Sequence, residues 1–174
     1  MHQLKLNMNK KILIIFIFFV SFLFNAAIAV EPKSIGKYKN WETFIYNDSK
    51  GKICFAQTIP LERDPKNFKR QPSRLFVTFR KSEKIKNEIS ITSGHEYKTS
   101  SVKAKSGRNE FSFFSQGNFA WLLDENEEKK FIKLMKRATD LMIKGKTKDG
   151  AETTDHYSMM GFTKAYNTAK KVCS

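Results

Sequence analysis

The C-terminal part of the chain most narrows the folds that this sequence can adopt. Two stretches that suit strands, Asp140–Lys146 and Glu152–Met159, flank the turn dipeptide Asp149-Gly150, in which glycine readily takes a positive φ. After Gly161 the spacing of apolar residues changes from that of a strand to that of a helix. One face of this helix carries Phe162, Ala165, Tyr166, Ala169, Val172 and Cys173. The sequence therefore predicts a hairpin, then an amphipathic helix over about residues 161–173 that ends in a cysteine.

Short strands are predicted at intervals of roughly ten residues along the rest of the chain, with turn residues between them. Residues 31–40 are polar and predict a loose lead-in, and the proline-rich stretch Leu61–Ser73 predicts a loop. A half-polar strand, Thr99–Lys105, is expected near a sheet edge, because lysines there discourage pairing with other chains. The other strands are expected at Trp41–Tyr46, Lys52–Thr58, Leu75–Arg80, Glu88–Thr92, Asn109–Phe114 and Phe119–Leu123. This pattern is typical of an all-β sandwich or barrel.

One further helix is predicted over about residues 124–138. Asp124, followed three residues later by Glu127, resembles a capping box. Acidic residues fill the first turn and basic residues the last, which complements the helix dipole. An apolar stripe is formed by Phe131, Leu134, Met135 and Ala138. We expect this helix to pack over one end or one face of the sheet.

The N-terminus predicts a secretory signal peptide over residues 1–29. Three lysines precede the apolar run Ile12–Val20, and Ala27-Ile28-Ala29 matches the A-x-A cleavage pattern. An uncleaved membrane anchor is the alternative, since the uncharged stretch is about long enough to span a bilayer. Cleavage after Ala29 would leave one domain, residues 30–174, in the periplasm or outside the cell.

Cys54 and Cys173 are expected to form a disulfide, because cysteines of exported proteins usually pair in an oxidising compartment. The bridge would enclose nearly the whole of residues 30–174. Neither cysteine lies in a C-x-x-C motif or near a histidine at metal-ligand spacing. We therefore expect no redox catalysis, no metal site and no cofactor.

The charge of the chain points to anionic partners. Its formal charge is +15, and loss of the three lysines of the signal peptide lowers this to +12. A field of this strength attracts envelope lipids, acidic glycans or acidic proteins. Export argues against a role in nucleic-acid binding. The alternative is compositional, since abundant Lys, Ile, Asn and Phe are the usage expected of an AT-rich genome.

The segment Arg63–Lys86 concentrates this charge, with nine basic residues against Asp64 and Glu83. A long basic loop on a rigid sheet suits the binding of an anionic surface. A solvated loop on a lysine-rich protein is the alternative interpretation. The five candidate anion-binding residues in the loop half are Arg63, Lys66, Lys69, Arg70 and Arg74.

No motif in the chain predicts catalysis. After the signal peptide the only histidines are His95 and His156, and no G-x-S-x-G, H-E-x-x-H or phosphate-binding loop is present. Asp155 and His156 are neighbours in a predicted strand, so their side chains point to opposite faces. We expect no catalytic residue, and a hydrolase using either histidine is the least favoured reading. The phenylalanines outside the signal are expected mostly on inward strand positions, in the core.

Several short motifs follow one another along the chain. They are Trp41, Cys54-Phe55-Ala56-Gln57, Val77-Thr78-Phe79-Arg80, Phe119-Ala120-Trp121, Ile143-Lys144-Gly145, Thr154-Asp155-His156-Tyr157-Ser158-Met159-Met160-Gly161-Phe162-Thr163 with Ala165, and the closing Cys173. In these motifs the chain resembles the invasion-associated locus B family of exported alphaproteobacterial proteins, over nearly all of residues 30–174. The part from Tyr157 to Ala165 is the most specific. The chain departs from the family's usual Gly-Thr turn at Gly150-Ala151.

This resemblance implies an immunoglobulin-like β-sandwich in the periplasm or envelope, with no catalytic residues to carry over. We therefore expect an exported, non-catalytic binding module for an anionic envelope or host partner. The alternative is a periplasmic structural or assembly accessory protein that docks through a sheet edge. An enzyme is the third and least favoured possibility.

Overall fold

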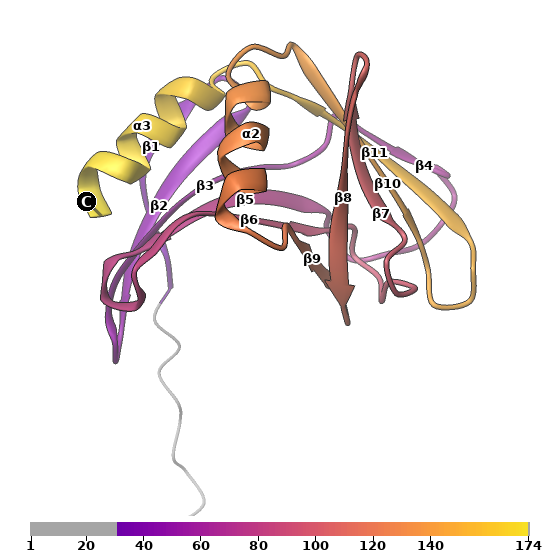
Figure 1. Ribbon diagram of the computed structural model, residues 1–174, viewed down its shortest axis with the longest axis horizontal. Coiled ribbons are helices and arrows are strands. Elements are labelled where there is room, and N and C mark those ends of the chain that lie inside the picture. The colour runs from indigo at the N-terminus through magenta and orange to yellow at the C-terminus, as the bar shows by residue number, and fades with distance from the viewer. Residues whose placement is uncertain (1–30, 174) are drawn as a thin grey trace, which may run out of the picture. The chain divides into compact units, whose positions relative to one another are not determined.

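The computed structural model describes residues 31–173, so the predicted signal peptide and its cleavage site lie outside the described residues. Within this range, eleven strands form one antiparallel sheet, and two α-helices pack on it (Figure 1). None of the helices of residues 31–173 has the length and apolar character needed to cross a membrane. The predicted all-β fold with two short helices is confirmed.

The elements follow the chain in an order that alternates strands with short turns. The strands are β1 (Lys33–Tyr38), β2 (Trp41–Asp48), β3 (Gly51–Thr58), β4 (Glu62–Asp64), β5 (Arg74–Arg80), β6 (Ile85–Thr92), β7 (Val102–Ser106), β8 (Asn109–Gln116), β9 (Phe119–Trp121), β10 (Asp140–Lys146) and β11 (Glu152–Ser158). The helices are the 3₁₀ turn η1 (Lys81–Glu83), α2 (Glu125–Met135) and α3 (Phe162–Cys173).

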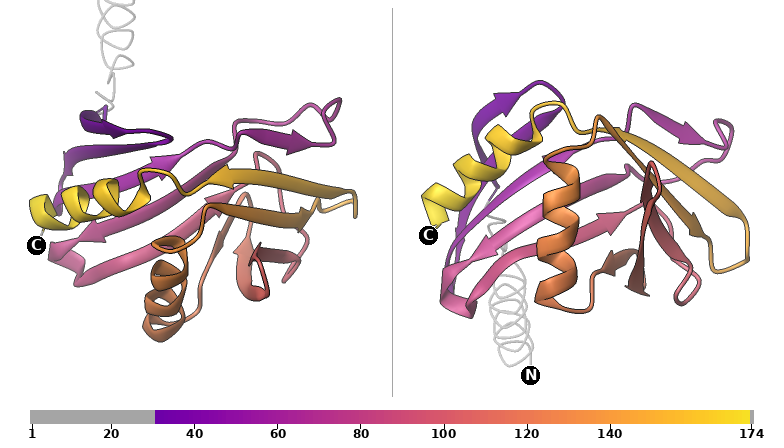
Figure 2. Two further views of the ribbon diagram at one scale, coloured as in Figure 1. Left: turned by 90° about the horizontal axis from the view of Figure 1, so that it is seen from above. Right: turned by 45° about the horizontal axis from the view of Figure 1, so that its top comes forward.

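The sheet has two halves that continue into one another. Its strand order is β1-β2-β3-β5-β6-β9-β8-β7-β10-β11-β4. Strand β8 joins the halves, because it pairs with β9 on one side and with β7 on the other. The sheet curves, and both helices lie against its inner face (Figure 2). The buried side chains of both halves and both helices form a single hydrophobic core.

Local sequence signals explain the helices and the last hairpin. The Asp124 carboxylate caps α2 by accepting hydrogen bonds from the backbone N–H groups of Asn126 (2.8 Å) and Glu127 (2.9 Å). Strands β10 and β11 pair from Lys146–Glu152 to Asp140–Ser158, as the turn dipeptide predicted. In α3 the apolar stripe is buried apart from the half-buried Val172, while the lysines of its last turns remain exposed.

The C-terminal helix is attached to the sheet by covalent and polar links. A disulfide joins Cys54 on β3 to Cys173 at the end of α3, with a Cα–Cα distance of 5.8 Å across 119 residues of sequence. The Trp41 indole packs against Phe162 with the ring planes tilted by 58° (4.8 Å between ring centroids) and donates to the Ser158 carbonyl (3.0 Å). The predicted disulfide therefore fixes the helix over β2, β3 and β5, where its apolar face is buried.

Three strands differ from expectation. Residues Lys33–Tyr38 form β1 instead of a loose lead-in, because an edge strand needs only one hydrogen-bonded neighbour and no apolar alternation. Within the predicted loop, the short β4 pairs with β11. Strand β7 lies between β8 and β10 and is no edge. Its lysines mark the exposed face of the strand, since Val102 and Ala104 point into the core.

The prediction that most phenylalanines lie inward is also wrong. In residues 31–173 only Phe79, Phe113, Phe131 and Phe162 are buried. The outer face of the sheet, opposite the helices, carries a row of rings that we call the aromatic face: Phe44, Phe55, Phe76, Phe119 and Trp121. Their centroids lie 5.2 Å (Phe44–Phe55), 6.0 Å (Phe55–Phe76) and 5.8 Å (Phe119–Trp121) apart. Alternation marks two faces of a strand but does not say which face a helix will cover.

Candidate anion-binding surfaces

The structure divides the basic segment Arg63–Lys86 between the two ends of β5. Of the five residues singled out in the sequence, four precede this strand and Arg74 begins it, whereas the lysines of the β5–β6 hairpin follow it. Because a strand separates them, the two groups cannot form one continuous site.

Arg70 is turned into the protein. Its side chain is 1% exposed and that of Asp155 is fully buried. The guanidinium donates to both carboxylate oxygens, with Nη1–Oδ2 at 3.0 Å and Nη2–Oδ1 at 2.7 Å. Nη1 also donates to the hydroxyl of Ser73 (3.0 Å) and to the Ser93 carbonyl (2.7 Å). This arginine is therefore a structural cation and does not present its charge at the surface.

Arg63 supports the same buried carboxylate from further away. Its Nε donates to the Ser73 hydroxyl (3.1 Å) and lies 3.9 Å from Asp155 Oδ1. Two of the five loop candidates thus converge on Asp155. The sequence held part of the signal for this arrangement: alternation sets Asp155 on the face of its strand opposite His156, and a buried charge needs a partner.

The other three loop candidates remain outside this network. Lys66 and Lys69 are exposed, and Arg74 is half-buried. None of the three forms an ion pair with any residue between 31 and 173. Phe68, 38% exposed, lies between the two lysines in sequence. This end of β5 therefore offers a small exposed basic patch, reduced from five members to three.

At the other end of β5, the lysines of the hairpin meet the end of α3. They border a cavity of about 630 Å³ that we call the hairpin hollow. Phe79, 4% exposed, and Cys173, 6% exposed, supply apolar walls. The residues that line the hollow are Phe79, Lys81, Lys84, Ile85, Lys86, Asn87, Lys170 and Cys173.

The hairpin backbone sets the shape of this hollow. Lys84 (φ 58°) and Asn87 (φ 72°) both adopt the left-handed conformation, and the β5–β6 register shifts between Thr78 and Phe79. Asn87 Oδ1 accepts a hydrogen bond from the Tyr166 hydroxyl (2.6 Å), which ties the hairpin to α3. With a regular β5–β6 register, the hairpin would approach α3 in a different position and the hollow would have a different shape.

The cations around the hairpin hollow are not neutralised by the protein. Among residues 31–173, no carboxylate pairs with Lys81, Lys84, Lys86 or Lys170. Three nearby carboxylates pair with other cations: Glu83 lies 3.1 Å from Lys50, Glu88 lies 2.7 Å from Arg80, and Glu125 lies 3.1 Å from Lys129. Burial lowers the pKa of Lys136, which lies over the Tyr166 ring, and the charge of Lys170 lowers it further. Positive potential therefore accumulates at this end of the molecule.

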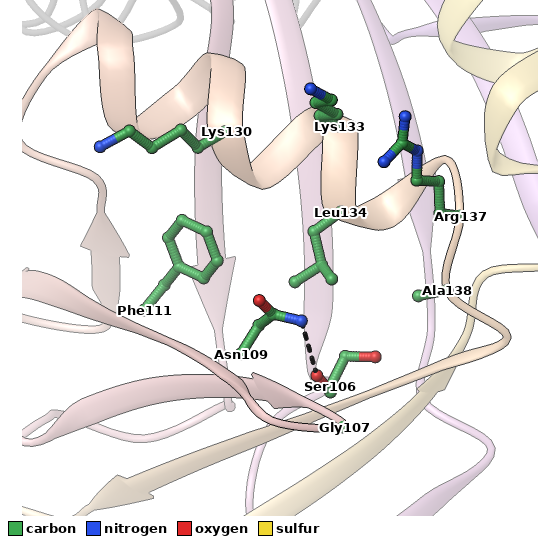
Figure 3. A pocket seen from close by; sticks show the side chains of 9 residues that line it. All are labelled: Ser106, Gly107, Asn109, Phe111, Lys130, Lys133, Leu134, Arg137 and Ala138. Carbon is green, nitrogen blue, oxygen red and sulfur yellow. Dashed lines mark hydrogen bonds between the residues drawn. The ribbon is translucent and has the colours of Figure 1, made fainter.

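A second basic hollow of about 570 Å³ lies between α2 and the β7–β8 turn. Figure 3 shows Phe111 and Leu134 facing the space, with Lys130, Lys133 and Arg137 along the helix. Here one of the cations is already paired, since Lys130 Nζ lies 2.8 Å from Glu127 Oε1. We call this cavity the helix hollow.

Carboxylates gather at a cavity that shares Lys84, Ile85 and Lys86 with the hairpin hollow. Glu88, Glu125 and Glu128 line this small cavity together with Lys84 and Lys86. Burial raises the pKa of Glu128 to about 7, and the neighbouring charge of Glu88 contributes to the rise. Between residues 31 and 173, no group of three or more His, Cys, Asp or Glu side chains is placed to hold a metal ion.

The two described histidines contact different groups. His95 Nε2 lies 2.9 Å from the hydroxyl of Thr153, but that hydroxyl is buried and donates to the Gly145 carbonyl (3.3 Å). Burial lowers the pKa of His95. His156 faces Asp64, at 3.8 Å, on the side of β11 opposite the buried Asp155. The side chains of Asp155 and His156 thus point to opposite faces of β11, as strand alternation predicted.

Comparison with known proteins bears on the fold. No protein-family model matches the sequence, and the search of curated proteins found no match. Among solved structures, the crystal structure of invasion associated protein B from Bartonella henselae superposes with a TM-score of 0.57. The superposition covers 80% of this chain and 96% of that chain, at 13% sequence identity. The chain has the fold of invasion associated protein B.

The resemblance seen in the sequence is thereby confirmed at the level of the fold. The motif residues that carried it are structural: Trp41 packs on Phe162, Cys54 bonds to Cys173, and Gly161 lets the chain pass close to the Tyr38 carbonyl. These residues hold α3 on the sheet. At 13% identity the likeness to invasion associated protein B shows the fold and identifies no binding residue in this chain. The same motifs also supply Phe55, Phe119 and Trp121 of the aromatic face. In the hairpin hollow they supply the apolar Phe79 and Cys173, whereas the four lysines lie outside the motifs.

Proposed function

We propose that this chain is an exported, non-catalytic envelope protein that binds an anionic partner, namely an envelope lipid, an acidic glycan or an acidic protein. One observation carries the proposal: four lysines without an ion-pair partner among residues 31–173 surround the hairpin hollow. Uncompensated cations on a rigid support attract anions and raise their local concentration. The formal charge of +12 expected after cleavage acts in the same direction.

Other observations support parts of this proposal. The predicted signal peptide supports export to the periplasm or beyond. The fold of invasion associated protein B supports an envelope role. The buried, already bonded Thr153 hydroxyl beside His95 supports a non-catalytic protein. Export is tested by the intact mass of the protein recovered from the cell envelope: a chain starting at Val30 fits cleavage after Ala29, and a full-length chain contradicts it.

The binding proposal is tested by co-sedimentation with vesicles of phosphatidylglycerol or phosphatidylcholine, and by retention on heparin. The decisive variant reverses three charges at the hollow, Lys84→Glu, Lys86→Glu and Lys170→Glu. Its matched control reverses three exposed lysines elsewhere, Lys37→Glu, Lys105→Glu and Lys144→Glu. Both variants have the same net charge. We expect at least about a tenfold weaker binding for the first variant and a smaller change for the control, with both affinities falling as salt rises.

Equal weakening by the two variants would mean that the charge acts diffusely, which is the compositional alternative. No binding of the unaltered protein to any anionic surface would refute the proposal. A third variant, Lys66→Glu, Lys69→Glu and Arg74→Glu, compares the loop patch with the hollow. Arg70 is left unchanged in all of them, because its guanidinium holds the buried Asp155.

A specific observation also favours a second function, that of an accessory protein docking through its sheet. The aromatic face is open, and two rings on this side of the sheet, Phe114 and Phe119, are 42% and 40% exposed. Exposed aromatic patches of this kind mark protein contacts. A photo-crosslinking residue placed at Phe119 in living cells should then capture one protein, whereas the same residue at Lys84 should not. Capture at Lys84 alone would favour the anion-binding function.

A further inference from the structure

We propose that the hairpin hollow binds a single-chain anionic lipid, with the alkyl chain against its apolar walls and the carboxylate or phosphate among its lysines. This inference rests on the proposed function, since it names the anionic partner of the same site. It commits to a ligand with both an apolar and a charged part. Both parts are read from the side chains that line the hollow.

The apolar part of the ligand follows from the walls. Three different elements supply them: Phe79 comes from β5, Ile85 from β6 and Cys173 from α3. The disulfide fixes the α3 wall to β3, so all three apolar walls belong to strands or to a helix that is held in place. A cavity of about 630 Å³ lies within the range of roughly 300–1,000 Å³ typical of small-ligand sites. An inorganic anion alone would leave these walls in water.

The charged part follows from the rim. Lysine side chains lay their methylene stems along apolar surface and keep the ammonium group in water. Lys84 and Lys86 enter from the hairpin, and Lys170 enters from α3. Because the neighbouring Glu83 and Glu88 pair with Lys50 and Arg80, a head group need not displace a carboxylate of the protein. The lysines at the rim therefore complement the charge of an anion, and no carboxylate of residues 31–173 takes that place.

Asn87 adds a polar contact at the same place. Its carboxamide oxygen is occupied by the Tyr166 hydroxyl, which leaves the NH₂ group to donate to an anionic oxygen. The left-handed backbone at Lys84 and Asn87 holds this part of the hairpin in position. The head group would therefore find lysines on two elements and one neutral donor between them.

The helix hollow is the weaker candidate for the same ligand. It also combines apolar side chains with cations, but Lys130 is engaged with Glu127 (Figure 3). Its cations all come from α2 and the residues that follow it, so they flank one side of the space only. This hollow therefore supplies the control position for the experiment.

The test uses the exported protein, ¹⁵N-labelled, titrated with dodecanoate and with dodecyl phosphate below their micelle concentrations. Acetate and inorganic phosphate provide the head groups without a chain, and dodecylphosphocholine provides the chain with a zwitterionic head. We expect dodecanoate or dodecyl phosphate to shift the amide signals of residues 84–87 and 170–173. Affinity for the chainless anions and for dodecylphosphocholine should be at least about tenfold lower.

Two variants separate the parts of the site. Ile85→Ser removes an apolar wall and keeps every lysine, while Lys84→Gln with Lys170→Gln removes charge and keeps the walls. Each should weaken binding of the alkyl anions about tenfold or more. Leu134→Ser in the helix hollow should leave it unchanged. Amide spectra without ligand establish that each variant is folded.

The outcomes distinguish this inference from the function on which it rests. Binding to phosphatidylglycerol vesicles without binding of either alkyl anion overturns the single-chain ligand and leaves the proposed function standing. Alkyl-anion binding that Ile85→Ser does not weaken, or that dodecylphosphocholine matches, also overturns it. If neither vesicles nor alkyl anions bind, both proposals fall.

Discussion

The Arg70 guanidinium and the Asp155 carboxylate form a two-point ion pair in the interior, at 3.0 and 2.7 Å, with almost no exposure of either side chain. The pair joins the loop before β5 to the inward face of β11. Desolvation of two charges is offset by their attraction only when hydrogen bonds satisfy both groups. Ser73 and Ser93 accept further hydrogen bonds from Arg70, and the more distant Arg63 adds a second cation. Of the buried polar atoms of the pair, Arg70 Nε alone has no hydrogen-bond partner among residues 31–173.

Removal of one partner of this pair should strongly destabilise the fold. We expect Asp155→Asn to lower the free energy of unfolding by about 3–5 kcal/mol, because Arg70 would be left buried without a counter-charge. Urea denaturation followed by circular dichroism measures the change. The double variant Arg70→Met with Asp155→Leu should lose less than the sum of the two single changes. An additive result would show that the two residues do not act as a pair.

The same pair shows where sequence reasoning stops. Arg70 stands among exposed lysines in the sequence, and the basic, polar character of this segment indicated that Arg70 lies at the surface. Its burial is decided by Asp155, which lies far away in sequence on a strand that β4 and the loop cover. Strand alternation predicted that Asp155 and His156 point to opposite faces. Nothing in the local sequence indicated which of them is buried or which cation would reach Asp155.

Local signals predicted the parts of the fold that depend on neighbours in sequence. Asp149-Gly150 placed the β10–β11 hairpin, Asp124 placed the start of α2, and the apolar stripe of α3 placed its buried face. Strand β1 was not predicted, because this edge strand has no alternating apolar pattern in its sequence. The hairpin hollow was not predicted either, because Lys84 and Lys170 come to line one cavity only after α3 has folded back on the sheet.

Loss of the disulfide should destabilise the protein without altering its strand order. The bridge closes a loop across 119 residues, and for loops of this length the chain-entropy account gives about 4–5 kcal/mol. We expect the variant Cys54→Ala with Cys173→Ala to lose about 2–5 kcal/mol of unfolding free energy in urea. Its amide spectrum should change mainly in α3 and β3. Unaltered stability would mean that noncovalent contacts, such as that of Trp41 with Phe162, are enough to hold α3 on the sheet without the disulfide.

Gly161 should tolerate no side chain, because the β1–β2 turn passes close to it. Its φ is +95°, and a Cβ at this position would lie 1.8 Å from the Tyr38 carbonyl oxygen. Gly161→Ala should therefore cost more than about 2 kcal/mol of unfolding free energy. The matched control is Gly107→Ala, which shares a positive φ (+58°) but has no atom within 4 Å of the added Cβ. The control should cost about 1 kcal/mol. Equal losses would show that backbone strain alone, without the close approach, explains both.

The Glu128 carboxyl should make the protein less stable as the pH rises from about 4.5 to 7. Burial raises its pKa in the folded protein from an ordinary 4.5 to about 7. In this window the folded state keeps the proton and the unfolded state loses it, so the free energy of unfolding falls with pH. Above pH 7 both states are ionised and the penalty is complete. Because the side chain is only partly buried, we expect a penalty of about 1 kcal/mol, less than the full pKa difference implies.

Glu128→Gln should remove this penalty, since an uncharged amide has no proton to lose. Urea denaturation at pH 5, 6, 7 and 8 should give curves for the two proteins that diverge with rising pH, the variant being the more stable by about 1 kcal/mol at pH 8. The control is Glu127→Gln in the same turn, whose carboxylate pairs with Lys130 at the surface. It should not gain stability as the pH rises. A variant at position 128 that runs parallel to the unaltered protein at all four pH values would show that Glu128 ionises normally in the fold.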